Sequence, residues 1–381
     1  MQKNKKTVFL SLLFMVIAAI GGGLHYRHTH SSARLGISLN GTDDGTMAAL
    51  HAEQGVEMAA DMLNEKGGVL GKPVQLISMN NKGTATGAAT AMEDLHLRHV
   101  AAVIGPLRED LIDASVLVAE SQNIALISPI VTNRAWSCSA ETGKPYNHVF
   151  QMALPPEREG AAMANFAAAV LHKSKSLIIC DNKNAASAEA AEAYAAFMNQ
   201  DAPIADTATV TPENIVFHLQ SAPYDSVYLP LPADTAAAYV SAVRNGTRSV
   251  PVLGSSLWSE DDMADLLPLP YLNNLFFTDQ YINDATYAPG EIFAERYYEK
   301  YGTIPDKYAA LSFDAAMLVA AAAEESASLN SADIAAALTK ISNYNGATGT
   351  ISVRADHSPD RKVHILTFWQ GSAALLCRLA P

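Results

Sequence analysis

The feature that most constrains the fold is a regular alternation, from Arg34 onward, of short apolar runs with longer segments of helical period. The runs RLGISL, PVQLISM, VAAVIG and IALIS are rich in Val, Ile and Leu, which is typical of strands buried on both faces of a parallel sheet. After the first run, apolar residues recur on one face of a helix: Val56, Ala59, Ala60 and Leu63. This order predicts an α/β fold with helices on both faces of a parallel sheet.

The same alternation starts again after a long loop over residues 129–147, through the runs HVFQM, SLIIC, SVYLPL, PVLG and NLFFTDQ. It predicts a second sheet of the same kind. The closing runs GTISV and VHILTFW are expected to pair antiparallel around a turn at residues 357–360. A chain of 381 residues exceeds what one core usually holds, so two domains are expected.

The N-terminal segment has the composition of an export signal. MQKNKK is basic, residues 8–20 are uncharged and apolar, and the small residues Ser31 and Ala33 fit a cleavage site. We therefore expect residues 1–33 to be a signal peptide and the protein to be exported to the periplasm or an equivalent extracytoplasmic compartment. If the leader is not cleaved, its apolar run would serve as a membrane anchor. No cysteine follows that run, which excludes a lipoprotein anchor.

Charge and motif content exclude several function classes. The formal net charge of −13 disfavours nucleic acid as a partner. The histidines are scattered without an H-E-x-x-H pattern, so no metal site is expected, and no cofactor motif is present. KGGVLG is followed by a strand rather than a helix and is not a phosphate loop. With no G-x-S-x-G motif and no nucleophile–base pair, we expect no catalysis and no catalytic residues. The three cysteines leave one thiol unpaired, although Cys138 and Cys377 could form a disulfide.

Four segments resemble the type I periplasmic binding proteins, in the branch that binds branched-chain amino acids and amides. The strongest covers residues 54–95 and contains NEKGGVLG at 64–71, an N-x-x-G-G-x-x-G turn whose glycines supply the positive φ angles for leaving a helix and entering a strand. VAAVIGP, IALISPIVTN and YGTIPDKYAALSFDAAMLVAAA follow in the order of the family. The resemblance extends over residues 34–369.

The resemblance implies two Rossmann-like lobes with parallel sheets, joined by three hinge crossings, with the ligand held between them. The crossings are expected near Gln151, Thr278 and Gly349. Lobe 1 would then comprise residues 34–151 and 279–348, and lobe 2 residues 152–278 and 349–381. Ligands of open α/β sheets bind beyond the carboxyl ends of the strands, which agrees with this arrangement.

In the family, two loops of the first lobe hold the carboxylate or amide of the ligand, and they match residues 106–110 and 128–133. Thr132 falls on the threonine position of the family and is expected to contact the ligand, or otherwise to close a turn; Asn133 follows it. Met47 lies in the first βα loop, where the family often places a contact.

Glu109 departs from the family pattern, because amino acid binders usually carry a serine there. A carboxylate at this point would repel a ligand carboxylate unless an arginine offsets it. Arg108 and Arg134 are the candidates, since a guanidinium binds an anion in a bidentate manner. Both could equally be solvated loop residues.

In the second lobe, two positions depart from the pattern of amino acid binders. Ala185 stands where the family carries a tyrosine, and Ser256 aligns with the acidic residue that holds the ligand amine. The usual ammonium clamp is therefore missing, which disfavours a plain branched-chain amino acid. Trp258 and Tyr308 could form walls of the site or simply pack in the core.

The leading hypothesis is a solute-binding protein, similar to leucine-binding proteins, that closes on a small polar molecule such as an amino acid, an amide or a related compound. It would deliver this ligand to the membrane permease of an ABC-type transporter. The alternative is a membrane-anchored sensor or regulatory module of the same fold, which an uncleaved leader would favour.

Overall fold

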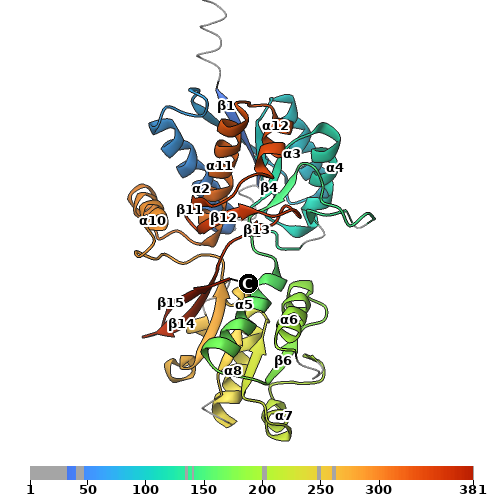
Figure 1. Cartoon of the computed structure of the whole chain (residues 1–381), viewed down its shortest axis with the longest axis vertical. Coiled ribbons are helices and arrows are strands. Elements are labelled where there is room, and N and C mark those ends of the chain that lie inside the picture. The colour runs from blue at the N-terminus through green and yellow to red at the C-terminus, as the bar shows by residue number, and fades with distance from the viewer. Residues whose placement is uncertain are drawn as a thin grey trace, which may run out of the picture.

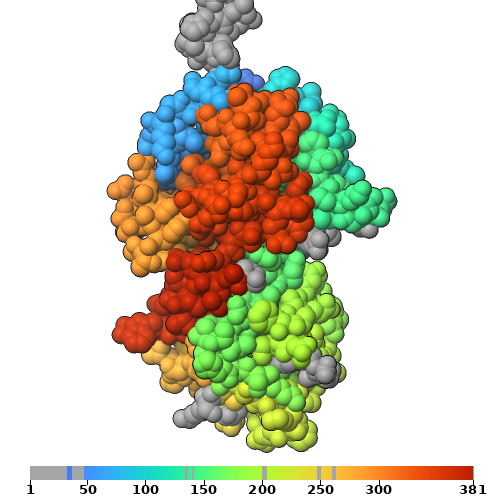
Figure 2. All heavy atoms as spheres, in the orientation of Figure 1, coloured from blue at the N-terminus to red at the C-terminus, as the bar shows by residue number. Residues whose placement is uncertain are grey.

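The computed structural model describes residues 32–39, 47–133, 136–139, 141–199, 204–246, 250–259 and 263–380. Arg134 and nearly all of the expected leader therefore lie outside the described residues. Two α/β bodies follow one another along the long axis of the molecule (Figures 1 and 2), with the chain passing repeatedly between them (Figure 1).

The first sheet is parallel and has the order β2-β1-β3-β4-β5. Its strands are β1 (Ala33–Leu39), β2 (Val74–Asn80), β3 (Ala102–Ile104), β4 (Leu126–Ser128) and β5 (Val149–Gln151). Successive residues along β3 and β4 point to opposite faces. Ile104 and Ile127 enter one core with helices α2 (Met47–Glu65), α11 (Lys307–Ser326) and α12 (Ser331–Leu338). Val103 and Leu126 enter another with α3 (Ala85–Leu97) and α4 (Ile112–Gln122), which makes three layers.

The second sheet has the order β15-β14-β10-β9-β8-β6-β7. The parallel strands are β6 (Ser176–Cys180), β7 (Ala205–Asp206), β8 (Ser226–Leu229), β9 (Val252–Gly254) and β10 (Leu275–Asp279). One face packs on α5 (Pro156–Asn165), its π-helical continuation η4 (Phe166–Val170) and α6 (Ala185–Phe197). The other packs on α7 (Ile215–Ser221) and α8 (Ala233–Gly246). The α/β fold with parallel sheets predicted from the alternation is confirmed.

Shorter elements complete the two bodies. Helix α10 (Ala288–Tyr301) packs beside α2, and the single turns are η2 (Glu109–Leu111), η5 (Ser256–Ser259), α9 (Met263–Leu266) and η6 (Leu269–Leu272). Among the described residues, no helix combines the length and the apolar character needed to cross a membrane. Cys138, Cys180 and Cys377 are all free thiols, so the pairing that the sequence left open is not formed.

The closing strands differ from the sequence expectation. GTISV forms β12 (Gly349–Val353), which pairs antiparallel with β11 (Tyr344–Gly346) and β13 (Pro359–Asp360). VHILTFW forms β14 (Val363–Trp369), which pairs with β10 and with β15 (Ser372–Leu379). The predicted pairing of these two runs is therefore wrong, because each run completes a different sheet.

The same strands bear on where the lobes divide. Ile351 is fully buried in the first core, which favours placing β12 with lobe 1 rather than after a boundary at Gly349. We propose that the third crossing lies between β13 and β14. We propose that the first two crossings follow Ala153 and Gln280, where the chain passes from one core to the other. We propose a lobe 1 of residues 33–153 and 281–360, and a lobe 2 of residues 154–280 and 361–380.

Two pairs of helices pack closely enough to require glycine. A Cβ on Gly55 of α2 would lie 2.1 Å from the carbonyl oxygen of Ala309 in α11. A Cβ on Gly160 of α5 would lie 2.1 Å from the carbonyl oxygen of Ala190 in α6. Alanine-rich α6 and α11 are thus held close to their neighbours, and both helices begin at the space between the lobes (Figure 1).

Candidate functional site

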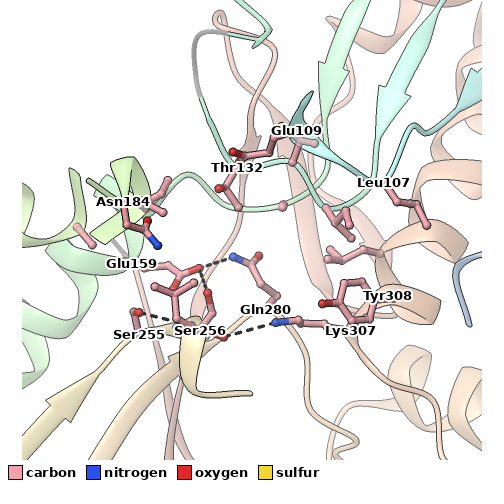
Figure 3. Close-up of a pocket in the computed structure, with 18 residues that line it drawn as sticks. Leu107, Glu109, Thr132, Glu159, Asn184, Ser255, Ser256, Gln280, Lys307 and Tyr308 are labelled. Atoms are coloured by element: carbon pink, nitrogen blue, oxygen red, sulfur yellow. Dashed lines mark hydrogen bonds between the residues drawn. The ribbon is translucent and has the colours of Figure 1, made fainter. Parts of the chain in front are cut away.

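A cavity of about 360 Å³ lies between the two lobes (Figure 3). Residues of both lobes line it: Leu107, Glu109, Ile130, Val131, Thr132, Ala153, Pro156, Glu159, Asn184, Ala186, Ala190, Ser255, Ser256, Leu257, Gln280, Lys307, Tyr308 and Leu311. Apart from the three residues of α11, they lie in the loops and first helical turns that follow strands at their carboxyl ends. In parallel sheets these ends share an edge, so the strand order itself assembles the cavity.

Glu159, on the first turns of α5, is the centre of a buried hydrogen-bond network in the cavity wall. Only 2% of its surface is exposed. Its Oε2 accepts from the Ser256 backbone N–H at 3.0 Å and from the Thr278 hydroxyl at 2.6 Å. Its Oε1 accepts from the Ser256 hydroxyl at 2.9 Å and from the Gln280 amide. Four donors occupy the acceptor positions of one carboxylate, so this group ties α5 to the loops after β9 and β10.

Gln280 carries this network to the crossings. Its side chain also bonds the backbone of Leu154, with the Leu154 N–H donating to Gln280 Oε1 at 2.9 Å. Arg361 donates to the backbone oxygen of Gln280 at 3.0 Å and to its side-chain oxygen. Burial lowers the pKa of Arg361 to about 10, which leaves the guanidinium charged at neutral pH. The Gln280 side chain in the cavity wall is thereby bonded to Leu154 at the first crossing and to Arg361 at the third.

Lys307, at the start of α11, is the cation among the described lining residues. Its Nζ lies 3.2 Å from the Ser259 hydroxyl and 3.4 Å from the Ser256 carbonyl oxygen, and 5.4 Å from the centre of the Tyr308 ring. Lys307 belongs to lobe 1 and both serines to lobe 2, so it bridges the cavity (Figure 3). Burial raises the pKa of Asp279 to about 6, although the positive charge of Lys307 acts to lower it.

Four of the residues predicted from the sequence line the cavity: Glu109, Thr132, Ser256 and Tyr308. Glu109 and Thr132 lie on the lobe 1 side, opposite Glu159 and Ser256 (Figure 3). Arg108 does not line it, because its guanidinium donates to both carboxylate oxygens of Asp110, at 3.0 and 2.6 Å.

The other predicted residues lie elsewhere. Met47 is 59% exposed at the start of α2 and does not line the cavity. Trp258 is 1% exposed and belongs to the second core, where its ring lies against Gly254, so it packs in the core rather than forming a wall. Asn133 does not line the cavity, and its carbonyl oxygen accepts from the Gln151 amide at 2.6 Å. Arg134 lies outside the described residues.

Four polar lining residues were missed by sequence reasoning: Glu159, Asn184, Gln280 and Lys307. The rule that a site follows strand ends, which predicts the loop at residues 255–258, would also have found Gln280, which comes directly after β10. Asn184 follows β6 and caps α6, where its Oδ1 accepts from the Ser187 N–H at 3.1 Å. Glu159 and Lys307 are placed by helix packing, for which the local sequence gives no signal.

Within the described part of the chain, no group of three or more His, Cys, Asp or Glu side chains is arranged to hold a metal ion. The cavity therefore offers hydroxyls, amides, the ammonium group of Lys307, the carboxylates of Glu109 and Glu159, and apolar walls. These groups suit the recognition of a small polar molecule.

Comparison with known proteins agrees with this geometry. The profile of the family described as "Periplasmic binding protein" matches residues 35–373. No curated protein sequence matches the chain at a significant level.

Several solved structures share the fold. The branched-chain amino acid transporter substrate-binding protein of Streptococcus pneumoniae, in complex with isoleucine, is 22% identical, with a TM-score of 0.71 over 92% of this chain and 100% of that one. A leucine-binding protein of Thermotoga maritima is 22% identical, with a TM-score of 0.70 over 92% and 99%. A solute-binding protein of an ABC transporter from R. palustris, in complex with benzoate, is 17% identical, with a TM-score of 0.68 over 92% and 97%. The resemblance noted in the sequence is thus confirmed over nearly the whole folded chain, and the protein belongs to the periplasmic binding protein family.

Proposed function

We propose that this protein is an extracytoplasmic solute-binding protein, which closes its two lobes on a small polar molecule and presents it to the permease of an ABC-type transporter. The observation that carries this proposal is the cavity of about 360 Å³, lined by both lobes at the carboxyl ends of their strands. Its size suits a molecule of amino acid or aromatic acid dimensions. Three crossings near its base let the lobes move as hinged bodies.

The polar groups support a ligand that carries a hydrogen-bond acceptor. A ligand carboxylate would lie beside Lys307 and away from the carboxylate of Glu109, which would repel it. Lys307 supplies the positive charge, and Thr132 and Ser255 supply hydroxyl donors from opposite lobes. Ile130, Leu257 and Leu311 offer apolar surface for the rest of the molecule. The relatives with isoleucine and benzoate bound show that the fold accommodates ligands of this size, and both of those ligands carry a carboxylate.

We also propose that the protein catalyses no reaction. Glu159 is the buried carboxylate of the cavity, and four donors already occupy it. A general base needs a free lone pair within reach of the proton it abstracts. Its position therefore suits a structural role in the binding site rather than proton transfer.

A thermal-shift screen of amino acids, amides and small organic acids tests the function, followed by titration calorimetry on each hit. We expect one saturable site and roughly tenfold weaker binding in Thr132→Ala, corresponding to about 1.4 kcal/mol for one lost hydrogen bond. The matched control is Thr339→Ala, which removes a hydroxyl at the end of α12, outside the cavity lining. If no compound of these classes binds, or if both variants weaken binding equally, the proposed site is wrong.

A further inference from the structure

A second cavity, of about 410 Å³, lies beside the strands that join the lobes. It shares no lining residue with the ligand cleft. Thr350 and Ser352 come from β12 of lobe 1, Arg361 and Lys362 from the third crossing, and His364 and Arg378 from β14 and β15 of lobe 2. In Figure 1, β12 and β13 lie at the lower end of one lobe, and β14 and β15 at the facing end of the other.

Positive charge gathers on the wall of this hinge cavity. Lys362 is exposed and makes no ion pair with any described residue. Arg378 pairs with Asp284 and lies 5.7 Å from the centre of the Tyr287 ring. Asp360, the carboxylate among the described lining residues, is already paired with Arg158. Asp284 and Asp360 are thus each paired with an arginine, whereas Lys362 has no ion-pair partner among the described residues.

Two residues of the wall carry buried polar atoms that lack a partner. The Nδ1 of His364 and the Nε of Arg361 make no hydrogen bond to any described residue. Buried polar atoms are nearly always hydrogen-bonded, to ordered water or a ligand if not to protein. Burial, together with the charges of Arg361 and Arg378, lowers the pKa of His364 to about 3. Its ring is therefore neutral at pH 7, near the positive charges of Arg361 and Arg378 and the opposing carboxylate of Asp284.

We propose that the hinge cavity is a second binding site, which takes a small oxyanion such as phosphate, sulfate or a carboxylate. Lys362 supplies a charge that no described carboxylate pairs, and Arg378 supplies the remaining N–H groups of a guanidinium that is paired with Asp284. Ser352 supplies a hydroxyl donor from the other lobe, whereas the Thr350 hydroxyl already donates to Asn345 at 3.1 Å. Arginine and lysine next to hydroxyl donors are the groups with which proteins hold such anions. A cation is disfavoured there, because Lys362 has no ion-pair partner among the described residues, whereas Asp284 and Asp360 are each paired with an arginine.

Because the hinge cavity lies between the lobes, an anion bound in it would contact both of them. Its wall is built from β12 on one side of the third crossing and from β14 and β15 on the other. A bound oxyanion would join the two lobes at the hinge, on residues separate from those that would hold the transported molecule. The inference goes beyond the proposed function and holds whatever the cleft binds.

Titration calorimetry with inorganic phosphate, on the full chain at low ionic strength, tests the site. We expect one saturable phosphate site, weakened at least tenfold in Lys362→Glu. The matched control is Lys340→Glu, the same charge change on an exposed residue at the end of α12. Arg378→Gln is the second variant, and its unfolding is measured separately because the change leaves Asp284 without its arginine. Sulfate should compete with phosphate, whereas chloride at equal ionic strength should not.

Imidazole NMR signals locate the bound anion independently of the variants. Phosphate should shift the signals of His364 in the hinge cavity and leave those of His218, on α7 of lobe 2, unchanged. The proposal is overturned by any of three results: phosphate binding that does not saturate, equal weakening by Lys340→Glu and Lys362→Glu, or saturation without a change at His364.

Discussion

The buried carboxylate of Glu159 gives a sharp prediction for a single residue. Glu159→Gln replaces one acceptor oxygen with an NH₂ donor, which then faces donors from Ser256, Thr278 or Gln280. We expect the free energy of unfolding to fall by about 1.5–3 kcal/mol, as for lost hydrogen bonds to a charged group. Urea unfolding measures it. Glu157→Gln, two residues earlier and partly exposed, is the control and should change stability by less than about 0.5 kcal/mol. Equal losses in the two variants would contradict the role of the network.

Asp279 predicts how stability depends on pH. Burial raises its pKa to about 6 in the folded state, above the ordinary value of 3.8. The folded state therefore binds the proton more tightly than the unfolded state, and this stabilisation is lost as the pH rises from about 4 to about 6. In Asp279→Asn the loss should disappear, so that relative to the parent the variant gains up to roughly 3 kcal/mol between pH 4 and pH 7. Urea unfolding at both pH values measures the difference. The same pH slope in both proteins would show that folding does not raise the pKa of Asp279.

At the scale of elements, close packing of α5 and α6 predicts the effect of one added methyl group. In Gly160→Ala the new Cβ would lie 2.1 Å from a backbone oxygen of α6, so the helices must separate. We expect a loss of about 1–3 kcal/mol in unfolding free energy. Since Asn184, Ala186 and Ala190 of this region line the cleft, ligand affinity should fall as well. Calorimetry and urea unfolding measure the two effects. Ala196→Ser, which adds one atom on the exposed side of α6, should change neither.

The elements also show what the sequence could predict. Continuous apolar runs identify the strands, because a strand that is buried on both faces needs apolar residues at every position. The loops after those strands hold Glu109, Thr132 and Ser256, as predicted. Partners of a strand are not encoded in its own residues, which is why GTISV was paired with the wrong run. Glu157, Arg158 and Glu159 are three consecutive charged residues, and nothing in the sequence distinguishes the one that becomes buried. The packing of α5 buries Glu159. For Trp258 the sequence allowed both a wall of the site and core packing, and Gly254 leaves the space in which its ring packs in the core.

For the whole molecule, the hinge predicts a change of shape on binding. Lys307 reaches from lobe 1 to Ser256 and Ser259 of lobe 2, so a ligand between these groups would contact both lobes at once. Closure maximises such contacts, and a ligand shifts the equilibrium by its difference in affinity for the two states. At about 100 times its Kd, a ligand should add about 2.7 kcal/mol to the unfolding free energy. Small-angle scattering of the same sample should show a smaller radius of gyration, and Thr132→Ala should need roughly tenfold more ligand for the same decrease. Stabilisation without any decrease would mean that the cleft binds its ligand with the lobes already fixed.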